Sequence, residues 1–176
     1  NSIFQNVIIR LMKLITFLPL LLSVLLLSCI RPEKDHATIH YYFTTTPDTT
    51  YKQLSFLFDF TRAHRTDEVR AVYLDSKFLS FKLNRPATYY LGESTIEPEV
   101  INGYDFGLYD FEVVKGSDTL PLSTQYNFSD FAPNYISPAP QQELHVTFVL
   151  DVAASIVLDS AGQDWMKPRI DISVSN

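Results

Sequence analysis

The chain has 176 residues, with 14 Lys and Arg against 20 Asp and Glu, and it contains a single cysteine. One cysteine excludes an internal disulfide and any metal site that needs two or more thiolates. Arg10 and Lys13 are the only charged residues before Cys29, so the remainder is strongly acidic, which argues against nucleic-acid binding. Aromatic residues make up 14% of the chain, a bias that favours β-sheet.

The amino-terminal segment has the pattern of a bacterial secretion signal. The chain starts at Asn1, and we expect the natural start at Met12, where Lys13 precedes an apolar run over residues 14–27. The run leads into an LLSC motif that ends at Cys29 and resembles the lipobox of bacterial lipoproteins. In such a motif the small residue before the cysteine fits the signal peptidase. The Cys29 sulfur is then expected to carry lipid, and several acyl chains anchor a protein stably.

An uncleaved transmembrane helix is the alternative, but the apolar run is shorter than the roughly 20 residues that span a bilayer and contains Pro19. We therefore predict upstream residues and a signal peptide over residues 1–28, a lipidated tether over 29–36, and a folded domain over 37–176. Ile30 stands where an Asp often retains lipoproteins at the inner membrane. We expect the outer membrane of the cell envelope as the location, on its periplasmic face or at the cell surface.

Segments of alternating apolar and polar residues follow, and each predicts a strand. The clearest is residues 53–60, where one face is expected to be buried and carries Leu54, Phe56, Phe58 and Phe60. Residues 62–68 are charged and predict a loop, and residues 94–101 predict a connector. The other strands expected in this half are residues 37–45, 69–74, 77–83 and 87–91.

Residues 103–114 predict a long strand whose apolar parity changes, so we expect one inserted residue, a β-bulge, near Gly107. Residues 115–118 predict a hairpin turn and 119–122 the returning strand. A loop over 123–142 precedes a strand over 143–150, a helical turn over 151–158 capped by Asp151, and a last strand over 169–174. About eight strands with regular turns predict an all-β fold, a two-sheet antiparallel β-sandwich of immunoglobulin or transthyretin type.

The carboxy-terminal half carries a second resemblance. Residues 146–172 hold Asp151, the triplet Ser155-Ile156-Val157 and the pair Lys167-Pro168. This pattern resembles a bacterial lipoprotein domain family known as domain of unknown function four-three-eight-two, and residues 103–122 resemble its Gly-x-Tyr strand and hairpin. The resemblance covers roughly residues 100–176. It implies an envelope lipoprotein with an immunoglobulin- or transthyretin-like sandwich, and it implies no activity and no catalytic residues.

Residues that could carry catalysis or bind metal form no recognisable constellation. The four histidines are His36, His40, His64 and His145, and the spacing of the first two suits a metal only on a helix. The sequence has no Gly-x-Ser-x-Gly nucleophile turn, and its carboxylate pairs fall in a charged loop. We therefore predict that the protein is not an enzyme and uses no cofactor and no metal.

Aromatic side chains are the remaining lead, with core packing as the alternative role. The strands over 37–45 and 87–91 place rings on both faces, so we expect Tyr42 and one of Tyr89 or Tyr90 to point outward. Exposed rings bind sugars or protein partners, and the candidate contacts are Tyr42, Tyr90, Tyr126, Phe131 and Tyr135. Two hypotheses stay open: a structural or protein-interaction module, and a carbohydrate-binding lipoprotein. A flat aromatic patch would favour the second, and an unpaired apolar sheet edge the first.

Overall fold

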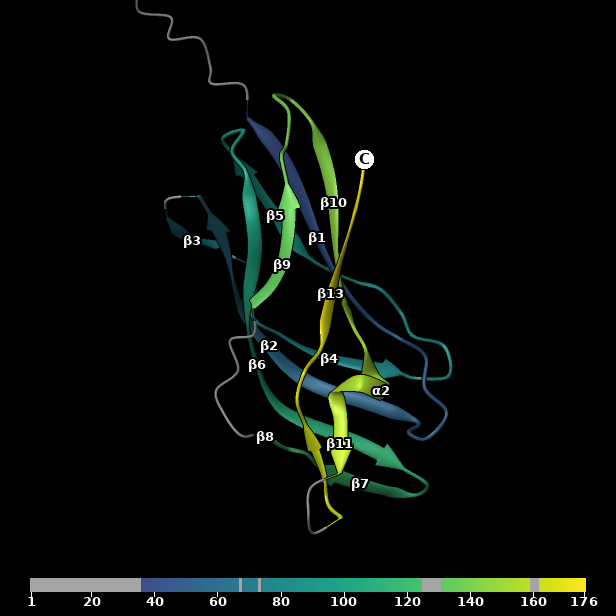
Figure 1. The fold of residues 1–176 in the computed structure, drawn as a ribbon. Coiled ribbons are helices and arrows are strands. Elements are labelled where there is room, and N and C mark those ends of the chain that lie inside the picture. Colours follow the sequence, from purple (N-terminus) through teal and green to yellow (C-terminus); the bar gives the residue numbers. More distant parts are fainter. Residues whose placement is uncertain (1–35, 67, 73, 125–130, 159–161) are drawn as a thin grey trace, which may run out of the picture. The chain divides into compact units, whose positions relative to one another are not determined.

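The computed structural model describes residues 36–66, 68–72, 74–124, 131–158 and 162–176 (Figure 1). All of the described strands lie in one compact unit, Asp35–Asn176. The predicted lipid attachment site Cys29 and the predicted contact Tyr126 lie outside the described residues. Among the described residues, no helix is long and apolar enough to cross a lipid bilayer.

The described unit consists almost entirely of β-strands. The first sheet has the order β13 (Ile170–Ser175), β10 (Glu143–Leu150), β1 (Ala37–Thr45) and β5 (Tyr89–Ile96). The second sheet is centred on β2 (Gln53–Arg65) and β6 (Ile101–Lys115). There β3 (Val69–Val72) and β4 (Lys77–Lys82) pair with β2, while β7 (Asp118–Pro121) and β9 (Phe131–Ile136) pair with β6. A small third sheet joins β11 (Ile156–Leu158), β12 (Asp164–Met166) and β8 (Ser123–Thr124).

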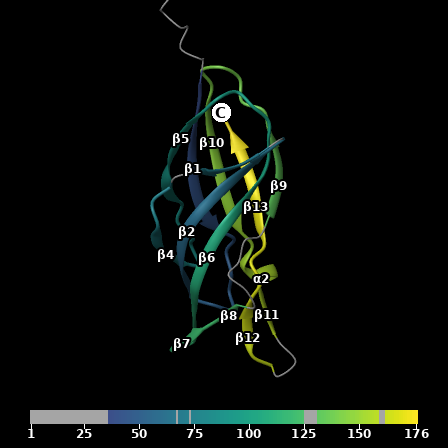
Figure 2. The same cartoon turned by 90° about the vertical axis from the view of Figure 1, so that its left-hand side faces the viewer.

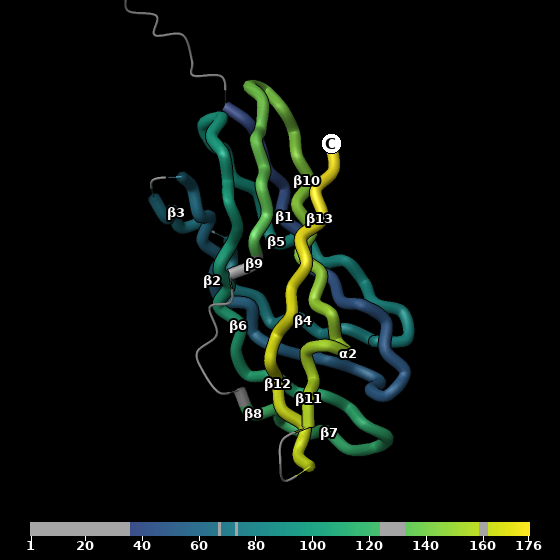
Figure 3. Tube along the Cα trace, in the orientation of Figure 1, coloured from purple at the N-terminus to yellow at the C-terminus, as the bar shows by residue number. Residues whose placement is uncertain are grey.

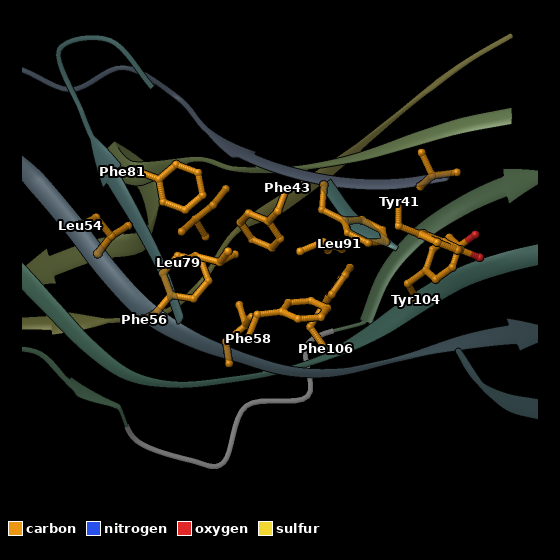
Figure 4. Packing of buried hydrophobic residues seen from close by; sticks show 14 of the residues in the cluster. Tyr41, Phe43, Leu54, Phe56, Phe58, Leu79, Phe81, Leu91, Tyr104 and Phe106 are labelled. Atoms are coloured by element: carbon orange, nitrogen blue, oxygen red, sulfur yellow. The ribbon is translucent and has the colours of Figure 1, made fainter. Parts of the chain in front are cut away.

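The first two sheets pack face to face around an aromatic core, which confirms the predicted β-sandwich (Figure 4). Phe43 on β1 contacts Phe56 of β2, with ring centroids 5.3 Å apart. Phe148 on β10 packs edge-on against Phe106 of β6, with ring centroids 4.6 Å apart. Burying these large rings stabilises the fold by an amount roughly proportional to the apolar area removed from water.

Two strand pairs depart from the antiparallel pattern, β12 with β8 in the small third sheet and β1 with β10 in the first sheet. β1 runs parallel to β10, with partners from Thr38 and Glu143 to Thr45 and Leu150, and antiparallel to β5 on its other side (Figure 2). Parallel neighbours cannot be joined by a tight hairpin, so they lie far apart in the sequence. Local alternation therefore predicts both strands but not that they are partners.

β2 runs to Arg65, through the charged segment that the sequence predicted as a loop. Leu54, Phe56 and Phe58 are fully buried as expected, but Phe60 is only half-buried. A register shift between Phe58 and Phe60 gives β2 one residue more than β6. The shift reverses the parity, so that Thr61 and Ala63 take the buried positions. The expectation that Phe60 faces the core is wrong for this reason.

The parity change expected in β6 exists, but it lies at Asp110 and not at Gly107. Just after Tyr109, β6 contributes one residue more than β2, and Asp110 has a φ of 52°. Asp tolerates this left-handed conformation because its short polar side chain can bond locally. Gly107 has another role, since a Cβ at this position would collide with the Phe60 ring.

Two segments that contain proline were predicted to be a loop and a connector, but both hold strand residues. The segment over 123–142 was expected to be a loop because of its prolines, but it holds β8 and β9. Pro133 lies in β9, an edge strand whose partner among the described residues is β6. Edge strands tolerate proline because the missing N–H need not join a ladder. β5 likewise runs to Ile96, into the predicted connector. The hairpin at residues 115–118 is confirmed, with Lys115 paired to Asp118 and Gly116 at a φ of 65°.

Asp151 caps the short helix α2 (Val152–Ser155), as the sequence predicted, and its Oδ1 accepts a hydrogen bond from the Ala154 N–H at 3.1 Å. The helical part is shorter than expected because β11 begins at Ile156. Ser155 is fully buried, and its Oγ accepts a hydrogen bond from the Arg169 N–H at 2.8 Å. This hydrogen bond ties α2 to the segment that leads into β13, and Figure 3 draws the path of the chain between the two.

Candidate functional site

The outer face of the first sheet carries four ring side chains that we call the outer ring cluster: His40 and Tyr42 on β1, Tyr90 on β5 and His145 on β10. Strict alternation along β1 sends its odd-numbered residues into the core and leaves its even-numbered residues facing outward. Strand register then brings the rings together, because His40 pairs with His145 and Tyr42 pairs with Tyr90.

The rings contact one another across three strands. His40 stacks on His145, with centroids 5.1 Å apart and planes 20° apart. Tyr42 lies 5.4 Å from Tyr90 and 5.7 Å from His145, measured between ring centroids. Adjacent strands lie roughly 4.8 Å apart, so the cluster spans roughly 10 Å across the sheet.

Polar atoms hold the rings at the margin of the cluster. The Tyr42 hydroxyl and His145 Nδ1 share a hydrogen bond of 3.2 Å. Glu93 on β5 lies with its Oε2 3.3 Å from His40 Nδ1 and 3.4 Å from the Tyr90 hydroxyl, which donates to it. Desolvation, and then the neighbouring Glu93 carboxylate, raise the pKa of Tyr90, so its hydroxyl stays protonated and able to donate.

Much of the cluster is open to solvent. Tyr90 is 46% exposed and the Glu93 side chain 61% exposed, whereas Tyr42 and His145 are half-buried against each other. Short hydroxyl side chains surround the rings, since Thr147 is paired with Tyr42 and with a serine of β13. The rings are tilted rather than coplanar at Tyr90, by 56° to Tyr42 and 40° to His40, and hydrogen-bonding groups lie along their edge. Such a partly apolar, partly polar surface suits a ligand that is itself amphipathic.

The predicted contact residues do not form one site. Tyr42 and Tyr90 come together, while Tyr89 packs against Phe81 with its hydroxyl donating to the Ser80 carbonyl at 2.6 Å. Tyr135 is 82% exposed on β9 of the second sheet and is not part of the cluster. Phe131 begins β9, where its backbone pairs with β6.

Sequence reasoning missed the two histidines of the cluster because it considered histidines only as metal ligands. The available signal was parity, since His40 lies two residues from Tyr42 and therefore shares its face. In the part of the chain that the structure describes, no three His, Cys, Asp or Glu side chains gather where they could hold a metal ion.

A second polar group lies on β2 and β6. Asp105 is buried, and its Oδ2 accepts from Arg62 Nη2 at 3.0 Å and lies 2.8 Å from His64 Nε2. Arg62 also lies over the Phe60 ring, 5.3 Å from its centroid. Arg62 and His64 are on the same strand and Asp105 is on its neighbour, so this group joins the two central strands of the second sheet.

Comparison with known proteins adds little to this geometry. No family model and no curated protein matches the sequence, so the resemblance of residues 146–172 to a lipoprotein domain family stays a prediction. A solved structure described as the NMR structure of a protein from Eubacterium rectale is similar over 82% of this chain and 92% of that chain. The identity is 8% and the TM-score 0.26, and at that TM-score the likeness carries no inference.

Proposed function

We propose that this protein is a lipid-anchored, non-catalytic module of the bacterial cell envelope whose outer ring cluster binds carbohydrate. The observation that carries the proposal is the group of four rings across β5, β1 and β10, of which Tyr90 is exposed and the others are half-buried, with the Glu93 carboxylate beside it. A sugar ring has apolar C–H faces and hydroxyl edges, so it can stack on Tyr90 and bond to Glu93 at the same time.

We favour carbohydrate over a protein partner because the large exposed apolar side chains of the described residues do not gather on any one strand. Each lies on a different strand or in a loop, although Tyr135 and Val174 line one pocket together: Val69, Phe78, Tyr90, Val100, Leu120, Tyr135, Leu158 and Val174. Scattered apolar residues are normal on a monomer, whereas protein interfaces need a larger continuous patch. The edge strand β13 also alternates with polar residues, which discourages strand addition.

The lipid anchor is proposed from the LLSC motif ending at Cys29. Seven residues lie between Cys29 and Ala37, where β1 begins, and an extended tether of that length reaches at most roughly 30 Å. A domain on such a tether works close to the membrane surface, where envelope glycans are abundant.

The carbohydrate proposal can be tested with residues 36–176, which contain all of the described strands and core residues. We expect this domain to bind a subset of sugars on a glycan array. Tyr90→Ala should weaken the best binding about 2- to 10-fold, because one stacking ring is lost. Tyr135→Ala is the matched control, since it removes an even more exposed tyrosine outside the cluster. Failure to bind any glycan, or equal loss in both variants, would reject the proposal.

The anchor is tested separately in cells, with the full chain. We expect radiolabelled palmitate to be incorporated into the wild-type protein and to be absent from Cys29→Ser, which should leave the membrane fraction. Unlabelled wild-type protein that keeps the apolar segment would contradict the anchor and leave the ring cluster proposal standing.

A further inference from the structure

A cleft of about 330 Å³ lies between β3 of the second sheet and β5 of the first. Each of these strands pairs with a neighbour on one side only, so the cleft opens between two sheet edges. Its lining combines apolar side chains, among them Ile96 and Ile101, with the polar residues Arg65 and Ser94. The volume is at the lower end of the range for small-molecule sites in proteins.

Arg65 is the unusual member of this lining. Its side chain is only 4% exposed, and its Nη1 donates to Glu99 Oε2 at 2.6 Å. Glu68 approaches the same nitrogen at 3.7 Å. The buried Nε–H makes no hydrogen bond within the described part of the chain. A buried donor without an acceptor costs about 1–3 kcal/mol, so this side of the guanidinium is a place where an acceptor gains affinity.

Two tyrosines add further donors at the same end of the core. The Tyr41 hydroxyl lies 3.1 Å from Ser94 Oγ, and both residues line the cleft. Figure 4 shows the oxygen atoms of Tyr41 and Tyr104 at one end of the aromatic core. Burial raises the pKa of Tyr41 and, further still, that of Tyr104, so both hydroxyls stay protonated.

We propose that the cleft between β3 and β5 binds a small molecule that carries a carboxylate on an apolar body, with the carboxylate accepting from Arg65. Two N–H groups on one side of a guanidinium match the two oxygens of a carboxylate. Hydrogen bonds between these charged groups are stronger than those between neutral groups. Arg70 and Glu93 also line the cleft, and Arg70 is paired with Glu68. The apolar body would contact Ile96 and Ile101. The acidic partners Glu68 and Glu99 are far more exposed than Arg65 and can turn toward water. Glu93 lines this cleft as well as the margin of the outer ring cluster, so the two proposed sites share one residue. Variants of Arg65 and Ala71 nevertheless test the cleft without changing a ring of the cluster.

The test uses ¹⁵N-labelled residues 36–176 and two probes of equal size, butanoate and its neutral amide. Butanoate should cause a saturable shift of the Arg65 Nε–H resonance, and the amide should bind at least tenfold more weakly. Arg65→Gln should abolish butanoate binding. Arg62→Gln is the matched control, because Arg62 lies three residues away on β2, outside the cleft lining.

Arg65→Gln removes a buried ion pair, so a second variant leaves that pair in place. Ala71 is exposed and lines the cleft, and Ala71→Leu fills part of it without touching the guanidinium. Butanoate affinity should fall at least fivefold in Ala71→Leu. The proposal is overturned by the absence of a saturable shift, by equal affinity for the amide, or by unchanged affinity in Ala71→Leu.

Discussion

Tyr41 and Tyr42 are neighbours on β1, yet they belong to different environments. Tyr41 is fully buried and contacts the core rings Tyr104 and Phe148. Tyr42 faces outward and contacts Tyr90 and His145. The same residue type is therefore used for stability on the inner face of the first sheet and is available for recognition on its outer face. Composition alone does not distinguish the two roles, whereas the face of the strand does.

The largest difference in unfolding free energy between the inner and outer faces is expected for two neighbouring residues of β10. Phe148 contacts four rings of the core, and Phe148→Ala should lower the free energy of unfolding by about 3–5 kcal/mol, since it leaves a cavity. Thr147→Ala, one residue away on the outer face, should change it by less than about 0.5 kcal/mol. Urea unfolding measures both. Similar costs for the two variants would break the distinction between the faces.

On the second sheet, the contact between Phe60 and Gly107 tests whether an outward-facing ring also contributes to stability. Phe60 covers Gly107, and Gly107→Ala should cost about 1–3 kcal/mol because the added methyl group collides with the ring. In a Phe60→Ala background the same substitution should be close to neutral. A double-mutant cycle measured by thermal unfolding isolates this coupling. Additive effects would show that the ring moves aside without cost.

Asp151 lies on neither face of the first sheet, so substituting it should change stability without changing glycan affinity. Asp151 lies just after β10 and caps α2, so Asp151→Ala should lower the free energy of unfolding by about 1 kcal/mol. Glycan affinity at a temperature where the protein is folded should not change. Asp171→Ala on β13 is the control, because this exposed carboxylate caps no helix. An unchanged melting curve for Asp151→Ala would remove the capping argument.

The smallest effect on stability is expected within the outer ring cluster. Tyr90 is nearly half exposed, so Tyr90→Ala should cost less than about 0.5 kcal/mol in unfolding free energy while it weakens glycan binding. Chemical denaturation and isothermal titration on the same samples compare the two effects. A loss of several kcal/mol would mean that the cluster serves stability, as the inner face does.

The sequence predicted those features that depend on one strand at a time. Alternation located β1 and β10 with correct bounds, and a polar residue before a short apolar run located the cap at Asp151. Each of these signals is carried by neighbouring residues. The sandwich class followed from the number and spacing of such strands.

Features that depend on two strands were missed or displaced. The extra residues that reverse the parity of β2 and β6 are set by the partner strand, so Phe60 and the bulge at Asp110 were misplaced. The outer ring cluster joins residues of β5, β1 and β10, and only register reveals that His40 and His145 share it with Tyr42. The burial of Arg65 was not predicted either, since its charged segment was expected to be a loop and instead continues β2.

The parallel pairing of β1 with β10 has a consequence for the order of folding. Thr38 finds its partner Glu143 more than one hundred residues later in the chain. Closing so long a loop is entropically costly, and non-local pairing slows folding. A ribosome must therefore synthesise nearly the whole chain before the first strand gains its central place in the sheet. Until then the nascent polypeptide lacks a complete core, because the strand that completes the inner face of the first sheet has not yet been made.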